Sequence, residues 1–235
     1  MGSMAVAVLD NPVWTSMVVA HPGLADVASV DGGSAGCYLH DVAPFGAVED
    51  PDDPACWAAL ASILDGQATC VIIEPSALPD GWNVVREIPG VQMDGTGLAV
   101  CEDDEAVALT TSNVAEMLAL VDRARPGPFL PRTVEMGSYL GIRDRDGSLI
   151  AMAGERLHPT GWTEISAVCT DAAYRGQGLG TRLVRAVAAG IRARGDLPFL
   201  HASAENVNAI RLYEALGFTL RRRCFFTIVQ ARREG

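Results

Sequence analysis

The sequence predicts an α/β protein in which a mixed sheet carries helices on both faces. Three observations support this prediction. Short runs rich in β-branched residues recur between turn residues, as strands require. One long segment, 179–194, repeats apolar residues at helical spacing. Beyond residue 106, the expected strands and helices alternate along the chain, which favours a sheet with helical connections.

The first 105 residues are expected to form an α/β unit of their own. Periodicity is unclear over the first 35 residues or so. The clearer segments that follow are a helix at 52–64 and strands at 69–74 and 82–88. Pro54 stands near the start of the expected helix and Gly66 follows its end, the usual positions for these residues. The polar segment 101–105 predicts the boundary with a second unit, 106–235.

The second unit has a more regular pattern. Its expected elements are a strand at 106–110, a helix at 113–123, strands at 139–143, 149–156 and 163–170, a helix at 179–194, a strand at 198–203, a helix at 206–216 and strands within 218–230. Segment 126–131 contains three prolines and cannot be a continuous helix. Asp146 and Gly147 predict a hairpin turn between two of the strands. In the helix at 179–194, apolar residues recur every four positions: Leu179, Leu183, Val187 and Ile191.

Composition predicts a soluble globular protein. The chain has 235 residues, of which 49% are hydrophobic and 20% are charged. Apolar runs fall short of the roughly 20 residues of a membrane span, and the first residues lack the features of a signal peptide. The cytoplasm is therefore the expected compartment. The six cysteines are scattered without metal-ligand spacing, so we expect reduced thiols and no metal site.

The charges are divided unevenly along the chain. Residues 1–105 contain 17 acidic side chains and one basic one, Arg86, whereas residues 106–235 contain 12 acidic and 17 basic ones. The simplest interpretation is an acidic solubilising surface. A functional interpretation is that the acidic part attracts a cationic partner and the basic part an anionic one. Nucleic acid is not expected as a partner, because the acidic half would repel phosphates.

A glycine-rich segment, 175–180, lies between an expected strand and an expected helix. Its sequence is Arg-Gly-Gln-Gly-Leu-Gly. Glycines allow a tight turn whose N–H groups converge, and at a helix N-terminus such groups favour an anion such as a pyrophosphate. A Walker loop is excluded because the chain contains no lysine. A dinucleotide fingerprint fits neither the glycine spacing nor the position in the chain. Taken alone, a glycine turn without a ligand remains an open alternative.

Two motifs in the second unit resemble those of the GNAT superfamily of N-acetyltransferases. Arg175, Gly178 and Gly180 match its pattern [QR]-x-x-G-x-[GA]. Segment 206–218 is similar to its second signature, N-x-x-A-x-x-L-Y-x-x-x-G-F. The motifs occur in the family's order, and the resemblance covers roughly residues 106–230. The arrangement looks most like the FR47-like branch, which carries an extra N-terminal region.

The resemblance implies a mostly antiparallel sheet flanked by helices and a cytoplasmic enzyme that uses acetyl-CoA as co-substrate without a metal. It implies transfer of the acetyl group to a primary amine by direct attack. Residues 1–105 would be a degenerate GNAT-like half, or a domain that binds the acceptor or forms a homodimer. The acceptor would be a small molecule or a peptide; neither nucleic acid nor membrane is expected as a partner.

The resemblance also implies which residues bind CoA. Backbone amides near the end of one strand would hold the pantetheine arm, the glycine segment would hold the pyrophosphate, and two side chains of the second motif would face the cofactor. The residues implied are Val168, Cys169, Thr170, Arg175, Gly176, Gln177, Gly178, Leu179, Gly180, Thr181, Asn206 and Tyr213. Independently of the family, Asn206 is a strong helix N-cap residue, and Arg175 is equally explained as a solvated surface charge.

Tyr213 is the candidate general acid. It follows Asn206 by seven residues, almost two helical turns, so both lie on one helical face. From that face its hydroxyl could protonate the departing thiolate. A packed tyrosine with a satisfied hydroxyl is the alternative interpretation.

Glu164 is the candidate general base, because matching positions in some family members accept the proton of the acceptor amine. An ammonium has no lone pair, so a base must act before attack. His158 and His201 are alternatives, and Cys169 has no evident base that would make it a nucleophile. Phe129 and Arg132, within the family's acceptor-side loop, are the candidate acceptor-binding residues.

Two other functions fit the same motifs. A non-catalytic acyl-CoA-binding module would need the glycine segment and Asn206 but not Tyr213. A transferase of a larger acyl group would use the same residues with a roomier pocket.

Overall fold

The computed structural model of the chain describes residues 8–64, 68–73 and 78–232. Its strands form two sheets. The smaller sheet has the order β1-β2-β3, and the larger has the order β4-β11-β5-β10-β9-β8-β7-β6. The strands are β1 (Ala25–Val30), β2 (Gly33–Tyr38), β3 (Gly46–Val48), β4 (Thr69–Ile73), β5 (Trp82–Asp94), β6 (Val107–Leu109), β7 (Tyr139–Arg143), β8 (Leu149–Glu155), β9 (Trp162–Thr170), β10 (Leu197–Ser203) and β11 (Thr219–Ala231). All pairings between these strands are antiparallel except β9 with β10.

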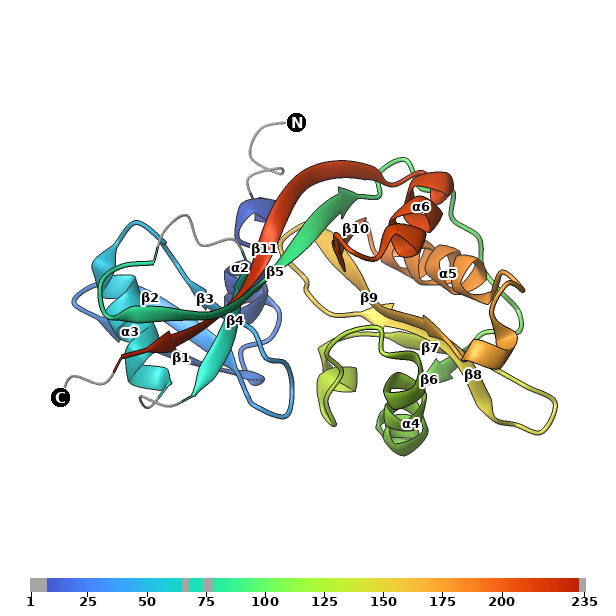
Figure 1. Cartoon of the computed structure of the whole chain (residues 1–235). Coiled ribbons are helices and arrows are strands. Elements are labelled where there is room, and N and C mark those ends of the chain that lie inside the picture. The colour runs from blue at the N-terminus through green and yellow to red at the C-terminus, as the bar shows by residue number, and fades with distance from the viewer. Residues whose placement is uncertain (1–7, 65–67, 74–77, 233–235) are drawn as a thin grey trace.

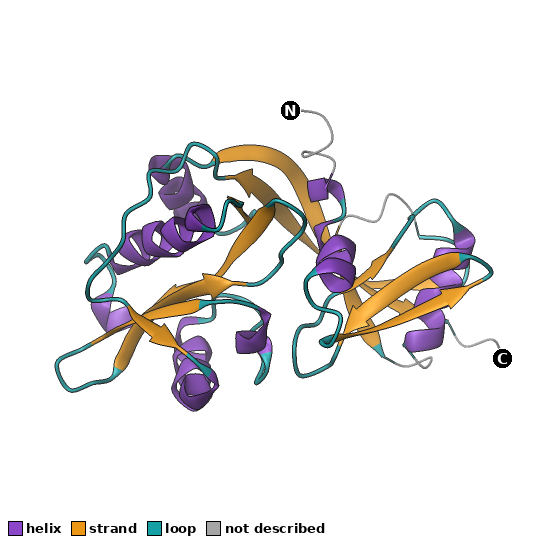
Figure 2. Cartoon of the chain, turned by 180° about the vertical axis from the view of Figure 1, so that it is seen from behind, coloured by secondary structure: helices purple, strands orange, loops and turns teal. Residues whose placement is uncertain are grey.

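The helices cover both faces of the larger sheet, as the sequence predicts. The α-helices are α2 (Pro12–Val19), α3 (Pro54–Ile63), α4 (Val114–Ala124), α5 (Leu179–Ala193) and α6 (Val207–Leu216). Short 3-10 helices are η1 (Val8–Asp10), η2 (Thr111–Asn113), η3 (Thr133–Met136) and η4 (Ala172–Tyr174). Helix α4 lies on one face of the larger sheet, and α5 and α6 lie on the other (Figure 2).

The apolar stripe of α5 explains why this helix packs on the sheet. Each of its four predicted stripe residues is buried, and none exceeds 6% exposure. Together with Leu216 of α6 and strand residues such as Leu200, they form one core. Burial of side chains of this size contributes about 1.5–3 kcal/mol each. The arginines of α5 lie off the stripe and are half-buried; Arg182 pairs with Asp103, and Arg192 donates to the carbonyl of Thr96.

Two long strands connect the parts of the molecule. β5 and β11 each have 13 residues and pair along most of their length, from Thr219 with Asp94 to Ala231 with Trp82. Figure 1 shows this pair running from the part that contains α3 to the part that contains α5 and α6. β5 lies inside the larger sheet, between β11 and β10. The hydrogen-bonded sheet therefore extends across the boundary predicted near residue 105.

Most elements lie where the sequence predicts them. The helix expected at 52–64 is α3, with the Asp53 carboxylate accepting the amide of Ala55 at its start. Of the first 35 residues or so, which showed no clear periodicity, the described ones form η1, α2, β1 and the first half of β2. The strand expected at 82–88 continues to Asp94. The described cysteines are free, and no described helix is long and apolar enough to span a membrane.

Candidate functional site

The centre of the larger sheet contains a fork between β9 and β10. Their parallel pairing runs only from Leu197 with Trp162 to Phe199 with Glu164. Beyond this point β9 pairs with β8 alone, through Thr170, and β10 pairs with β5 alone, through Ser203. We call the separating segments, 165–170 of β9 and 200–203 of β10, the strand fork. Its inner edges offer backbone N–H and C=O groups that have no strand partner among the described residues.

A β-bulge distorts β9 within this fork. The register of β8 and β9 shifts between Met152 and Gly154, and Ala167 has a φ of +53°. A left-handed alanine is uncommon and costs roughly 1–2 kcal/mol relative to an extended one. Bulges re-aim backbone groups and are frequent beside functional sites. This bulge lies in the part of β9 that has separated from β10, and pairing with β8 resumes at Cys169 and Thr170.

The glycine segment lies beside the end of β9. Gly176 and Gly178 have φ values of +79° and +77°, in the left-handed region, and a Cβ on either would meet no atom within 4 Å. A Cβ on Gly180 would lie 3.9 Å from Thr170 Oγ1, 3.9 Å from Val168 Cγ1 and 4.0 Å from Leu212 Cδ2. The segment therefore approaches both β9 and α6. Gly178 is the N-cap of α5 and makes no side-chain cap, so the first amides of α5 are available to an anion.

Helix α6 contributes the second motif to the same place. The side chain of Asn206 caps it, with Oδ1 accepting the amide of Ala209 at 3.2 Å. Tyr213 is 8% exposed and packs edge-on against Phe218. Burial, with a smaller contribution from Cys169 of β9, raises the pKa of Tyr213 to about 12. Its hydroxyl is therefore protonated at neutral pH, as a proton donor must be.

Glu164 is buried in a network of hydrogen bonds. Its carboxylate accepts two bonds from Arg156, at 2.9 and 2.8 Å, and one from His201 Nδ1 at 2.8 Å. Burial alone would raise the pKa of Glu164, but attraction to Arg156 and the hydrogen bond from His201 lower it to about 2. The structure disfavours the predicted base role, because a fully buried carboxylate with such a low pKa is a poor proton acceptor.

The two alternative histidines, His201 and His158, differ in their contacts: the buried Nε2 of His158 has no hydrogen-bond partner among the described residues. His201 has no exposed side-chain surface and lies between Glu164 and Gln92. His158 keeps 23% of its side chain exposed, with Nε2 3.5 Å from Glu155 Oε2. Its ring lies 5.2 Å from that of His21, and burial lowers its pKa.

The two predicted acceptor-binding residues lie in different settings. Phe129 is 5% exposed and packs edge-on against Tyr139 in a core cluster under α4. This burial disfavours a role in binding substrate. Arg132 pairs with Glu135 and Asp41, at the contact between segment 126–137 and the N-terminal part of the chain.

Two other predicted CoA-binding residues, Cys169 and Arg175, lie near the fork. Cys169 is 7% exposed, and burial raises the pKa of its thiol to about 12, which argues against a covalent intermediate. Arg175 is exposed at the start of the glycine segment.

Two residues of the buried network, Arg156 and Gln92, were not predicted from the sequence. A usable signal existed for Arg156. The strands expected at 149–156 and 163–170 follow one another in the sequence, and pairing between them could have been considered. In the structure the carbonyl of Glu164 accepts the amide of Arg156, and opposite charges are favoured at such facing positions. Gln92 has no such signal, because its partners come from distant parts of the chain.

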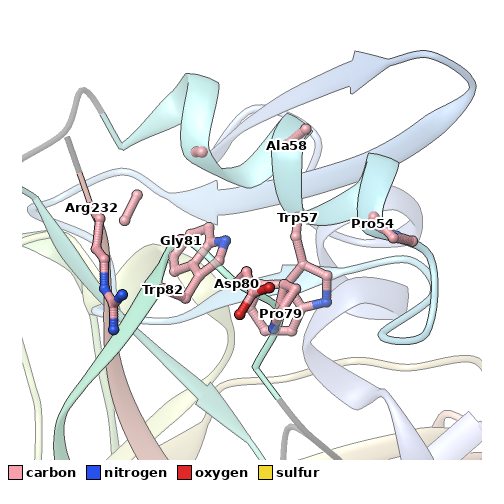
Figure 3. A pocket seen from close by; sticks show the side chains of 10 residues that line it. Pro54, Trp57, Ala58, Pro79, Asp80, Gly81, Trp82 and Arg232 are labelled. Atoms are coloured by element: carbon pink, nitrogen blue, oxygen red, sulfur yellow. The ribbon is translucent and has the colours of Figure 1, made fainter. Parts of the chain in front are cut away.

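A separate cavity lies in the N-terminal part of the molecule, between α3 and the far ends of β5 and β11 (Figure 3). Its volume is about 540 Å³, and it contains none of the predicted site residues. Its lining includes Trp57, Trp82 and Asp80. In Figure 1, α3 and the glycine segment before α5 lie at opposite ends of the molecule. The cavity is therefore distinct from the site at the fork.

Comparisons with known proteins agree with the motifs. The model of FR47-like proteins matches residues 139–227. A crystal structure from Novosphingobium aromaticivorans, described as an acetyltransferase from the GNAT family, is 39% identical, with a TM-score of 0.83 and coverage of 96% of this chain and 99% of the other.

Two curated relatives match shorter stretches. Mycothiol acetyltransferase of Thermobispora bispora is 37% identical over 87 residues, which are 33% of this chain and 29% of the relative. N-alpha-acetyltransferase RimI of Mycobacterium tuberculosis is 37% identical over 93 residues, which are 37% of this chain and 57% of the relative. The match thus spans less than two thirds of the length of either curated relative.

Proposed function

Because this chain belongs to the GNAT family of acetyltransferases, we propose that it transfers an acetyl group from acetyl-CoA to a primary amine. One observation carries the proposal. The glycine segment before α5, the unpaired edge of β9 and helix α6 meet around Gly180. The amides that would bind an anion, the free backbone groups of β9 and the protonated hydroxyl of Tyr213 would thereby lie close together.

The residues fit CoA in shape and in hydrogen bonding. The space beside Gly176 and Gly178 would let phosphates approach the backbone closely, and the first amides of α5 would donate hydrogen bonds to them. Arg175 adds a cation at the entrance. The amides of Val168 and Thr170 would bind the pantetheine arm, which would lie along β9 as an extra strand. When bound, acetyl-CoA supplies the reactive thioester.

Tyr213 would protonate the sulfur that leaves. Its raised pKa keeps the hydroxyl protonated at neutral pH. The hydroxyl would give this proton to the sulfur as the C–S bond breaks, and the tyrosinate would then regain a proton from solvent water. A backbone amide of the bulged segment of β9 would stabilise the developing oxyanion. We assign the proton of the amine to solvent water, because Glu164 and His201 are fully buried and bound to each other.

The acceptor is proposed to be a cationic amine, small or peptidic. The N-terminal 105 residues carry 17 acidic side chains against one basic one, and this field would attract an ammonium. Part of this region, including Asp41, contacts the 126–137 segment on the α4 side of the sheet.

The burial of Glu164 favours a second candidate, a non-catalytic acyl-CoA-binding module. Such a module needs no base and no acid. Both candidates predict CoA binding, so they differ only in turnover and in the requirement for Tyr213.

Tyr213→Phe separates the two candidates. We expect turnover to fall about 100-fold, since general acid catalysis contributes 10²–10⁴, while the Kd for CoA changes less than about twofold. Release of free thiol from acetyl-CoA with a pool of amines measures the first quantity, and calorimetry measures the second. Unchanged kcat in the variant would remove the acid role, and absence of thiol release in the wild type would favour the binding module.

A further inference from the structure

The two strands of the fork are joined beyond their last backbone pair by one side-chain bond. Phe199 and Glu164 form the last backbone pair. Two residues further along β10, His201 Nδ1 reaches back to Glu164 Oε1 at 2.8 Å. Neither side chain has any exposed surface. This bond therefore stands at the point where β9 and β10 separate.

The surrounding groups fix where the proton of His201 resides. Gln92 Nε2 lies 2.9 Å from the carbonyl of Leu9, and Gln92 Oε1 accepts a bond from Arg221 at 2.7 Å. These two partners orient the amide, so its nitrogen also donates to His201 Nε2, 3.0 Å away. His201 Nε2 must therefore carry the lone pair. The proton is on Nδ1 and is donated to Glu164.

The charges agree with a neutral His201. The carboxylate of Glu164 is balanced by the bidentate guanidinium of Arg156. A second proton on His201 would face the amide hydrogens of Gln92. The network continues through Arg221 to Asp10, at 2.5 Å, so it also ties the N-terminal residues to the fork.

We propose that Glu164 and His201 are positioning residues that hold the strand fork at the opening that CoA requires, with Gln92 fixing the tautomer of His201. The inference rests on the proposed function, because it assigns the fork to CoA. The free edge of β9 begins one residue after Glu164, and the bulge at Ala167 follows. We call the hydrogen bond between Glu164 and His201 the clamp. Loss of the clamp would let the two strand segments pair with each other or move apart, and the amides of β9 would no longer match the pantetheine arm.

Three variants test the clamp. His201→Leu removes the bond to Glu164. His201→Asn keeps an amide donor near the position of Nδ1. His21→Leu is the control, since His21 is also buried and has two hydrogen bonds, to Tyr38 and to the carbonyl of Met136, neither of which involves β9 or β10. All are compared with the wild type well below their melting temperatures.

We expect the Kd for CoA to rise about tenfold in His201→Leu and to remain within about threefold of the wild type in His201→Asn and His21→Leu. Hydrogen exchange at 162–170 and 197–203 in the ligand-free protein should accelerate in His201→Leu only. Wild-type CoA affinity and exchange in folded His201→Leu would overturn the proposal, as would an Asn variant no better than Leu. If the wild type fails to bind CoA, the proposed function fails, and the exchange data still decide whether the clamp exists.

Discussion

The cavity beside α3 and the strand fork between β9 and β10 are built in opposite ways. The cavity is a preformed space of about 540 Å³ with walls that include two tryptophans and two prolines. The fork is formed by two strand edges, and it gathers backbone amides, a helix N-terminus and the hydroxyl of Tyr213. A large cavity is the default candidate for a ligand site. Here the family motifs and the reactive groups lie at the fork instead.

The difference teaches that a binding site can be built mainly from backbone groups rather than from the side chains that line a cavity. A ligand that pairs with a strand edge and with the amides of a helix N-terminus is held by hydrogen bonds along its length. Such a site needs strands held apart at a fixed distance. Side chains that hold the strands then matter as much as those that touch the ligand.

The largest effect should follow from unbalancing the charge at the fork. Glu164→Leu leaves Arg156, which is 6% exposed, without its carboxylate, and loss of one partner from a buried pair costs about 3–5 kcal/mol. Denaturant unfolding measures this loss. The double variant with Arg156→Met should recover much of it, because no charge is then left unpaired.

The same residue gives a pH dependence with a defined sign. The pKa of Glu164 is about 2 in the folded protein and 4.5 in its ordinary state, so its contribution to stability is complete above pH 4.5 and is lost as the pH falls toward 2. The stability difference between wild type and Glu164→Gln should therefore shrink in this window. A difference that is constant from pH 5 to pH 3 would contradict the assigned ion pair.

An intermediate effect is expected at the glycine segment. Gly178→Ala forces a Cβ into a conformation with φ of +77°, which costs roughly 1–2 kcal/mol. We expect a matching loss of stability and about tenfold weaker CoA binding, measured by thermal unfolding and calorimetry. Gly190→Ala is the control within the same helix. Its Cβ would lie 3.7 Å from Arg194 Nη1, and the helix should gain up to about 1 kcal/mol.

The smallest effect is expected at the cavity. Ala58 is exposed and lines it, so Ala58→Leu should change stability by less than about 0.5 kcal/mol. Acetyl transfer should be unchanged, as measured by thiol release. A marked loss of activity would show that the cavity and the fork are coupled, and would contradict the conclusion that they are separate sites.

The sequence predicted the fold of the second part well because its signals are local. The stripe of α5, the cap at Asn206 and the turn at Gly147 depend on neighbours in the chain. The position of the glycine segment followed for the same reason. The position of β5 in the larger sheet was not predicted, because its pairing with β10 and β11 depends on residues more than a hundred positions away.

Side-chain roles were harder to predict than positions. Phe129 was expected in a pocket and lies in the core, since an aromatic residue in a proline-rich segment has the same sequence pattern in either place. Glu164 was expected at the active surface, but Arg156 and His201 bind it in the interior. The partners of Glu164 come from other segments of the chain, so its environment could not be predicted from the sequence of β9 alone.

The central place of β11 has a consequence for how the chain acquires its structure. β11 follows every other strand in the sequence, yet it fills the space between β4 and β5, pairing Phe226 with Ile73 and with Ile88. Its residues Val229 and Ala231 also complete the core beneath α3. During synthesis on the ribosome, the edges of β4 and β5 that pair with β11 therefore stay open until β11 has emerged. We expect folding of both parts to finish together, after β11 is synthesised, with these edges most exposed to aggregation just before β11 docks.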